Sequence, residues 1–489
     1  MIKRRALAGQ HFLTGCDLHF LSDDEIEIIH LGSLEVLEKS GVFVEHDQAL
    51  NIFESSGAMV DRNKKIVKIP GYLVEECIRT CSPKVLIAGR DPKDDVYFES
   101  NRVHFCPFGI GVAVNDPFTG EYRKAVKEDV ANAAKLCDAL EEIDMLELVV
   151  TPSDVNPKTA NLHIYEALIT NSTKPCLTDP EPCLSPYIFR MAEVIAGGKE
   201  NLKNRPPMCG IVCPQSPLML HHNLCEGIIQ YARRELPMVM EPMTMAGATS
   251  PVTLAGTLVA HNAEVLACLT LAQLTQKGTP VIYGCTSTIF DMKTVTSSVG
   301  CPEISMIAAS IVKLAQHYKI PTWVAGGLTD SKLNDMQAGH EKTLTALLPA
   351  LAGANMIYGF GMLDIGLTFD FSSLTADNEF IKMIRRILEG IPVNDKSLAV
   401  DVIKEVGAMG NYLQHDHTLE GFKTEQSRAK LLDRRNREQW KNSGATDLTT
   451  RIEEETRQIL TTHQPEPLPE STAQELRKII EEAESELLG

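Results

Sequence analysis

Short apolar runs alternate with longer amphipathic segments from about residue 103 onward. The runs have the length of buried parallel strands, and the segments between them repeat apolar residues with the period of an α-helix. Strands are predicted at 103–108, 146–151, 175–179, 207–212, 237–241, 280–283, 322–325 and 356–360. Helices are predicted at 128–141, 162–171, 186–195, 223–234, 251–276, 302–318 and 335–352. Eight strand–helix units indicate the α/β class and a (β/α)8 barrel, a TIM barrel, with its active site at the carboxyl ends of the strands.

The chain before this repeat has a mixed pattern. Ser22 and Glu25 form a capping-box sequence ahead of apolar residues at helical spacing, and Gly41 is expected to end that helix. A second helix and a β-hairpin are predicted over residues 47–69. We therefore expect a small α+β segment over residues 1–100.

The chain after the predicted barrel is more polar. We expect the barrel to span residues 101–392 and residues 393–489 to form a helical arm and tail. Within the arm, the proline-rich segment 464–469 is expected to be an extended linker, and Thr472 with Glu475 is expected to cap a last charged helix. A docking or oligomerisation role is the simplest interpretation of the arm, and a role specific to one partner is the alternative.

Residues that directly follow the predicted strands should meet at one mouth of the barrel. Several of them are aromatic, and Glu241 ends the fifth strand. Aromatic faces combined with a carboxylate suit a quaternary ammonium ion, because they attract it by cation–π interaction and by opposite charge. The alternative is that the aromatic side chains only pack the rim. The phenylalanines in this set are Phe105, Phe108, Phe290, Phe360, Phe369 and Phe371.

The loop after the seventh predicted strand is the most distinctive part of this mouth. Gly326 and Gly327 end the strand, because glycine allows backbone angles and close approaches that other residues do not. The loop that follows begins at Leu328 and should point into the mouth. His340 lies early in the next helix, where it either supports the site or only belongs to a helix face.

Composition excludes several classes of function. The net charge of −18 argues against nonspecific nucleic-acid binding, which needs clustered lysine and arginine. No run of about 18 uncharged apolar residues suggests a membrane span, and the amino terminus lacks the apolar stretch of a secretory signal. Thirteen cysteines, an odd number, fit reduced thiols better than a disulfide framework. These features together indicate a cytoplasmic protein.

No bound metal is expected. Two cysteine pairs lack CxxC spacing and are expected to be structural, and a histidine pair has no third ligand nearby. The sequence also has no glycine-rich phosphate loop, no HExxH, no GxSxG and no convincing nucleophile–base pair. The residues considered are Cys77 with Cys81, Cys209 with Cys213, and His415 with His417.

Five longer segments form distinctive motifs. They are VAGGLTDSK at 324–332, QAGHEK at 337–342, LLPALAGAN at 347–355, SPVTLAGTLV at 250–259 and GIPVN at 390–394. Together they resemble the trimethylamine methyltransferase family of corrinoid-dependent enzymes, and the resemblance extends over essentially the full chain. It implies a (β/α)8 barrel that presents a methylated amine to the cobalt of cobalamin, a corrinoid carried by a separate partner protein.

The founding members of that family carry pyrrolysine in the loop after the seventh strand. Leu328 stands at the matching position here, whereas Asp330 and Lys332 match. The chain therefore resembles the non-pyrrolysine branch, whose members demethylate glycine betaine, proline betaine, carnitine or γ-butyrobetaine. A quaternary ammonium leaves as a neutral tertiary amine, so it needs no electrophilic residue. Orientation of the methyl group toward cobalt should carry the catalysis, and no general acid or base is expected.

The resemblance implies a quaternary amine substrate, glycine betaine first. A homo-oligomer is also expected. We expect Glu241 to face the ammonium, and we expect the carboxylate of a betaine to bind the backbone of Gly326 and Gly327, or His340 or Lys332. A betaine-binding protein without catalysis is the alternative. The candidate substrate-binding residues are Phe105, Phe108, Glu241, Tyr283, Gly326, Gly327, Leu328, Asp330, Lys332, His340 and Phe360.

Overall fold

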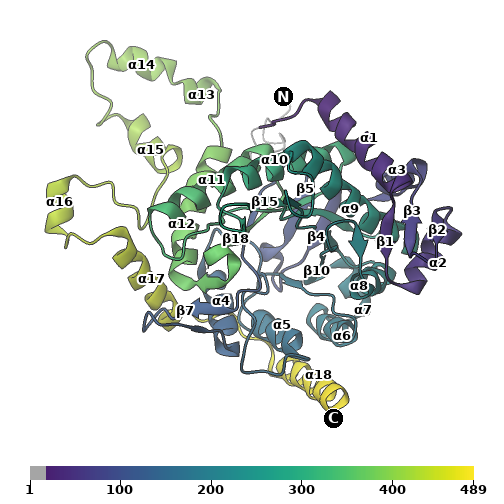
Figure 1. Cartoon of the computed structure of the whole chain (residues 1–489). Helices are drawn as coiled ribbons and strands as arrows, with labels where there is room; N and C mark the ends of the chain where they lie inside the picture. The colour runs from purple at the N-terminus through teal and green to yellow at the C-terminus, as the bar shows by residue number, and fades with distance from the viewer. Residues whose placement is uncertain (1–17) are drawn as a thin grey trace.

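A computed structural model describes residues 18–489 and contains a closed parallel barrel (Figure 1). Seven strands pair in the order β9-β10-β12-β14-β17-β18-β6. Residues 144–146 fill the remaining position, because the Asp144 amide donates to the Phe105 carbonyl and the Leu146 amide to the Pro175 carbonyl, both at 2.8 Å. The predicted (β/α)8 class is confirmed. The strands are β6 (His104–Pro107), β9 (Cys176–Thr178), β10 (Met208–Val212), β12 (Met238–Met240), β14 (Val281–Cys285), β17 (Thr322–Ala325) and β18 (Met356–Phe360).

Helices surround the barrel on the outside. They lie close to the predicted ranges, and the largest difference is at α9, which begins at Leu254 with Thr253 as its N-cap instead of at residue 251. The helices are α4 (Lys127–Ala139), α5 (Ala160–Thr170), α6 (Ser185–Ala196), α7 (Lys199–Asn204), α8 (His222–Arg233), α9 (Leu254–Thr275), α10 (Pro302–Tyr318), α11 (Met336–Ala352) and α12 (Phe371–Leu388).

The amino-terminal segment packs against one side of the barrel. The predicted capping box is present, since the Ser22 side chain accepts from the Glu25 amide at the start of α1. The segment consists of α1 (Asp23–Lys39), β1 (Val42–Val44), α2 (Asp47–Ser55), β2 (Met59–Asp61), β3 (Ile66–Lys68) and α3 (Gly71–Thr80). Helices α1, α2 and α3 contact α9. Among the described residues, α9 alone is long and apolar enough to cross a membrane, and 72% of its apolar window is buried inside the fold.

A β-hairpin closes the amino-terminal end of the barrel. It consists of β4 (Lys84–Ile87) and β5 (Val96–Glu99), and its buried side chains share one apolar cluster with the barrel interior. The Phe98 ring stacks on Trp323 of β17 at 6.3 Å between centroids. In addition, His104 of β6 is bonded to the Tyr97 carbonyl at 3.2 Å. With this end covered, a site inside the barrel must open at the carboxyl ends of the strands.

The loops at those carboxyl ends contain short strands. They form the sheets β19-β20-β7-β8 and β13-β15-β16, and β11 pairs with β1. Their bounds are β7 (Ala113–Asn115), β8 (Tyr122–Lys124), β11 (Met219–Leu220), β13 (Met245–Ala246), β15 (Thr288–Asp291), β16 (Thr296–Ser298), β19 (Met362–Leu363) and β20 (Thr368–Asp370).

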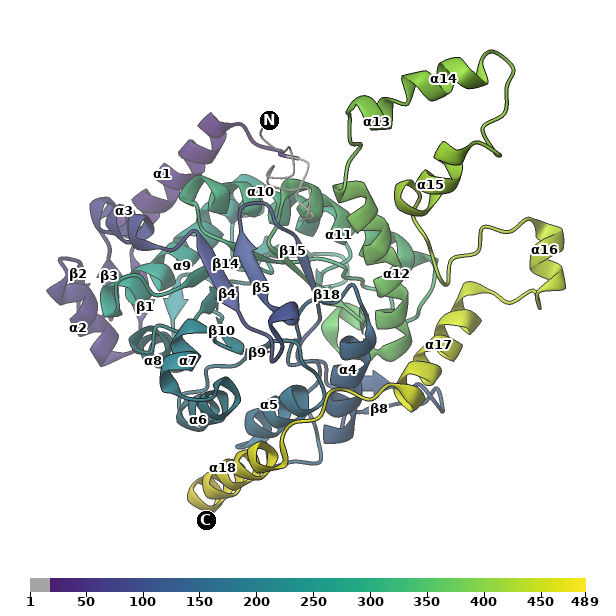
Figure 2. The same cartoon turned by 180° about the vertical axis from the view of Figure 1, so that it is seen from behind.

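The carboxyl-terminal part divides into two kinds of segment. Helices α13 (Asp395–Leu398), α14 (Val400–Val406), α15 (Asp416–Glu425) and α16 (Arg437–Asn442) extend away from the barrel (Figure 2). By contrast, α17 (Leu448–Thr462) packs on α4 and α12, and α18 (Glu470–Leu488) packs on α5 and α6. The predicted cap at Thr472 is wrong, because α18 begins at Glu470 and its N-cap, Pro469, has no side-chain bond.

Candidate functional site

A cavity of about 690 Å³ lies at the carboxyl ends of the barrel strands. Loops after β6, β9, β10 and β12, residues 147–148 and the start of α8 form most of its wall. The lining residues are Phe108, Gly109, Ile110, Glu147, Leu148, Asp179, Pro180, Glu181, Ile211, Val212, Cys213, His221, Asn223, Leu224, Glu241, Met243, Thr286 and Tyr358. The position agrees with the rule that barrel enzymes work at this end.

Two buried carboxyl groups dominate the electrostatics of the cavity. Glu241, directly after β12, is 3% exposed, and its Oε1 atom has no hydrogen-bond partner. Glu147 is also 3% exposed, and its Oε2 atom accepts from the Leu148 amide at 2.8 Å. Burial raises the pKa of Glu147 to about 8, and the nearby charge of Glu241 adds to this effect. Burial also raises the pKa of Glu241 to about 7, and the hydroxyls of Thr286 and Tyr358 partly offset the rise.

The ionisable side chains of the lining are mostly acidic. Asp179 and Glu181 add two further carboxyl groups, and His221 is the sole histidine of the lining. No lysine or arginine is present among the described residues that line the cavity. A cavity with four carboxyl groups and no lysine or arginine favours a cation.

Two aromatic side chains give the cavity a face for such a cation. The rings of Phe108 and Tyr358 lie parallel, with 6.5 Å between centroids and an interplanar angle of 10°. The Tyr358 hydroxyl is bonded to Thr286, which orients the ring. Stacked rings beside a carboxylate bind a quaternary ammonium through the negative faces of the rings.

Three of the aromatic candidates lie outside this cavity. Phe105 points to the helical layer, where the Arg385 guanidinium lies 5.0 Å from its ring centroid. Phe360 packs on Phe105 in the same layer at 5.7 Å. Tyr283 donates its hydroxyl to Asn262 of α9 at 2.8 Å. Side chains alternate between the two faces of β6 and β14, and a register shift between Tyr358 and Phe360 turns Phe360 to the outer face of β18. These three residues therefore hold the helices to the barrel instead of lining its mouth.

The loop that begins at Leu328 is close to the cavity but does not line it. Leu328 is 2% exposed and belongs to the apolar cluster of the barrel interior, together with Tyr358 and Met362. Its amide donates to the Thr345 hydroxyl at 2.9 Å. The side chain lies against Gly359, where a Cβ atom would come within 2.5 Å of it. Leu328 thus supports the strand that carries Tyr358.

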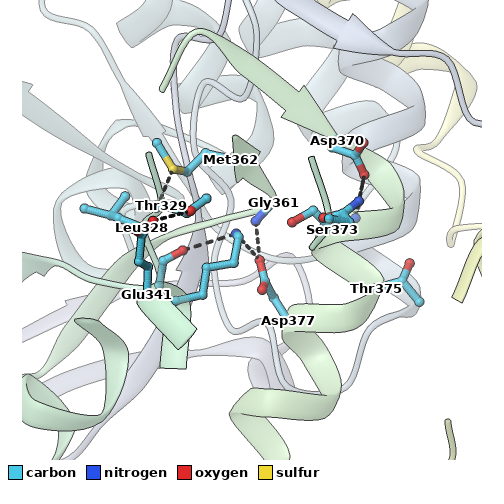
Figure 3. Close-up of polar contacts among 12 residues, drawn as sticks. Leu328, Thr329, Glu341, Gly361, Met362, Asp370, Ser373, Thr375 and Asp377 are labelled. Atoms are coloured by element: carbon cyan, nitrogen blue, oxygen red, sulfur yellow. Dashed lines mark hydrogen bonds and ion pairs between the residues drawn. The ribbon is translucent and has the colours of Figure 1, made fainter. Parts of the chain in front are cut away.

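The rest of this loop is fastened to α11 and α12 (Figure 3). Thr329 donates its hydroxyl to Glu341 at 2.6 Å, and the buried Lys342 bonds to the Gly327 carbonyl at 3.2 Å. Lys342 also pairs with the buried Asp377 at 2.7 Å. Asp377 in turn accepts from the Gly361 amide at 2.7 Å. One internal ion pair therefore holds the backbone that follows β17 and the backbone that follows the adjacent strand β18.

The predicted carboxylate-binding groups do not face the cavity. Lys332 is exposed and bonds to the Asp330 carbonyl at 2.8 Å, and His340 is exposed on α11. The Asp330 side chain accepts from the amides of Val299 and Gly300 at 2.8 and 3.1 Å, so it ties two loops together. The amide of Gly326 donates to the neighbouring strand β18.

Comparison with known proteins places the chain in a family. A family model described as Trimethylamine methyltransferase (MTTB) matches residues 5–487. The chain is 48% identical over 480 residues to Trimethylamine methyltransferase MttB of Desulfitobacterium hafniense, covering 98% of this chain and 97% of the relative. The chain belongs to the trimethylamine methyltransferase family. It is therefore a member of a methylamine-type methyltransferase family, as the motifs predicted.

Three other proteins are similar to this chain at lower identity. Trimethylamine methyltransferase MttB of Methanosarcina thermophila is 40% identical, with 96% of this chain and 98% of the relative covered. The Glycine betaine methyltransferase of Desulfitobacterium hafniense strain Y51 is 29% identical over 86% of this chain and 88% of the relative. The crystal structure of the Methanosarcina barkeri monomethylamine methyltransferase MtmB superposes with a TM-score of 0.50 at 13% identity, covering 90% of this chain and 93% of that one, and it supports the barrel fold alone.

The sequence pattern missed Glu147 and Tyr358 as site residues. Glu147 was placed inside the predicted second strand. In the structure, that segment pairs with the barrel only around Leu146, so the next residue already reaches the mouth. Over residues 18–489, no three His, Cys, Asp or Glu side chains are placed to hold one metal ion.

Proposed function

We propose that the protein transfers a methyl group from a quaternary amine to the cob(I)alamin of a separate corrinoid protein. The observation that carries this proposal is the acidic and aromatic cavity with no lysine or arginine in its described lining. Membership of the trimethylamine methyltransferase family supports the methyl-transfer chemistry. The leucine at position 328 fits a quaternary substrate, because such a substrate needs no electrophilic residue to make its leaving group neutral.

The proposed roles of the side chains follow from charge and shape. Phe108 and Tyr358 hold the ammonium by their ring faces, and Glu241 supplies the opposite charge. The positive charge disappears as the methyl group leaves, so tight binding of the cation adds little to the rate. The main catalytic contribution of the cavity is then to point one methyl group outward, toward the cobalt.

The lining favours quaternary ammonium ions without a carboxylate over glycine betaine. Neither Lys332 nor His340, the expected carboxylate donors, lines the cavity. A betaine carboxylate would instead meet Glu147, Glu181 or Asp179. Tetramethylammonium and choline are therefore the first substrates to test, and glycine betaine is the alternative that a 29% identical relative suggests.

A panel assay tests the proposed function. The protein, its reduced corrinoid partner and one amine at a time are incubated, and methyl-cobalt is followed by absorbance while the tertiary amine product is identified by mass. We expect methyl-cobalt with at least one quaternary amine. Binding of a quaternary amine without methyl-cobalt formation would instead favour a binding protein.

An apolar rim supports docking of a corrinoid protein at this mouth. Exposed apolar side chains lie on segments that follow β6, β12, β14, β17 and β18, and two of them, Ile110 and Met243, line the cavity. Such a rim suits a partner that must cover the mouth while the methyl group is transferred. The rim residues are Ile110, Val112, Met243, Met292, Val295, Leu333, Met336 and Leu367.

The extended arm supports self-association. Helices α13, α14 and α15 contain no buried residue, and Ile391, Ile403 and Leu413 are 88%, 54% and 75% exposed. An arm without its own core needs a permanent cover, and a corrinoid partner that leaves after each transfer cannot provide one. A second copy of the chain can, since interfaces of obligate oligomers are large and apolar.

Light scattering on an arm variant tests this oligomer. Ile403→Asp with Leu413→Asp should lower the measured mass to that of a smaller species, because charges in an apolar interface are costly to bury. Lys404→Gln, an exposed change on the same helix, should leave the mass unchanged. A wild-type chain that already has the mass of a monomer would contradict the proposal.

A cytoplasmic location is also proposed. All twelve cysteines within residues 18–489 are free thiols, which suits a reducing compartment. Recovery of the native protein in a membrane or secreted fraction would contradict it.

A further inference from the structure

Glu147 and Glu241 reach the cavity from different parts of the barrel wall. Glu241 follows β12, whereas Glu147 follows the irregular segment between β6 and β9. Neither carboxyl has a lysine or arginine partner, and Glu241 keeps one oxygen without any hydrogen bond. The Glu147 carboxyl lies directly on Gly109, where a Cβ atom would be 2.3 Å from Oε2. The backbone therefore makes room for this carboxyl, although it has no evident structural partner except the Leu148 amide.

The charge of Glu147 depends on its acidic neighbours in the cavity. Two nearby carboxylates in a dry site resist simultaneous ionisation, and the charges of Glu241 and Asp179 both raise the pKa of Glu147. The groups that face them are acidic or neutral apart from one histidine. They are Asp179 and Glu181 after β9, Cys213 after β10, His221 before α8, Thr286 after β14 and Tyr358 on β18. Near neutral pH, the empty cavity therefore keeps about one proton on the pair.

We propose that Glu147 and Glu241 are a proton-sharing carboxyl pair that releases its proton to solvent when the ammonium ion enters. The inference rests on the proposed function, because it concerns the same cavity. One positive charge enters as one proton leaves, so the net charge of the filled cavity equals that of the empty one. Both carboxylates then face the cation, and the exchange selects substrates that bring no negative charge of their own.

Calorimetry on the wild-type protein tests the exchange directly. Tetramethylammonium is titrated at pH 7 in two buffers with different enthalpies of protonation, which reports the number of protons released. We expect about one proton per cation. The affinity should also increase roughly tenfold between pH 7 and pH 8, more steeply below pH 7, where both carboxyls are protonated, and level off above about pH 9. Glycine betaine should bind at least about tenfold more weakly at pH 8.

Two variants test the role of Glu147 separately from the roles of the other cavity residues. Glu147→Gln should roughly halve or further reduce the proton release at pH 7 and remove the pH dependence above about pH 8, because only Glu241, with a pKa of about 7, can then release a proton. It should leave the fold intact, because it replaces a buried acid by a neutral group of the same shape. Gly109→Ala should weaken binding of tetramethylammonium, since the added methyl displaces the Glu147 carboxyl. Glu264→Gln is the matched control, because burial also raises the pKa of Glu264 to about 7 but its side chain holds Ser216 and Leu218 outside the cavity.

The outcomes distinguish this inference from the proposed function. Methyl-cobalt formation from tetramethylammonium with no proton release would overturn the inference and leave the function standing. Equal binding of glycine betaine and tetramethylammonium would overturn the selection against negative charge. No binding and no methyl transfer with any quaternary amine would remove the proposed function itself.

Discussion

Replacement of Lys342 with methionine is expected to lower the free energy of unfolding by about 3–5 kcal/mol. Lys342 and Asp377 form an ion pair whose side chains are 3% and 1% exposed. Removal of the lysine leaves a buried carboxylate without its charge partner, and the Gly327 carbonyl loses a donor. Chemical denaturation measures the change.

Two further variants show whether the Lys342–Asp377 ion pair is responsible for the expected loss of stability. Lys342→Met combined with Asp377→Leu should recover most of the loss, because an apolar pair in a dry site is often as stable as an ion pair. Lys332→Met is the control in the loop that precedes α11, since that lysine is 65% exposed and should contribute about 0.5 kcal/mol or less. A loss below about 1 kcal/mol for Lys342→Met would contradict the assigned role.

Substitution of Glu241 by glutamine is expected to weaken binding of choline by about 10–100-fold at pH 8. At that pH the carboxyl is largely ionised, because its pKa is about 7. The change removes one charge beside the cation, and partial screening leaves about 1.4–2.8 kcal/mol of that attraction. Calorimetry measures the dissociation constant.

A neutral ligand provides the control for shape. 3,3-Dimethylbutan-1-ol has the form of choline without its charge, and its binding should be unaffected by Glu241→Gln. The variant should be at least as stable as the wild type, because it removes a buried acid. Equal weakening of both ligands would mean that Glu241 shapes the cavity and does not attract the cation.

The barrel could be predicted because its signals are local. Apolar runs such as Thr322–Ala325 and Met356–Phe360 have the bounds that the pattern predicts. The second strand was the exception, since residues 144–146 contribute only isolated pairings. Apolar periodicity reports burial, and these residues are buried without forming a regular strand.

The site was harder to predict because it depends on which way each side chain points. Glu241 and Phe108 were found, since both directly follow strands. Phe105 and Phe360 have the same residue type but lie on the opposite face, and a shift of one residue in a strand reverses every side chain. Glu147 was missed because the second strand was predicted to span residues 146–151, which put Glu147 inside the strand instead of at the mouth.

Single-turnover transfer tests the central claim most directly. The protein is mixed with its corrinoid partner in the cob(I) state and with tetramethylammonium, and the absorbance of cob(I)alamin and methyl-cobalt is recorded while trimethylamine is measured. We predict one methyl-cobalt and one trimethylamine for each cob(I)alamin consumed, with slower or weaker reaction in Glu241→Gln. No methyl-cobalt from tetramethylammonium, choline or glycine betaine would contradict the claim.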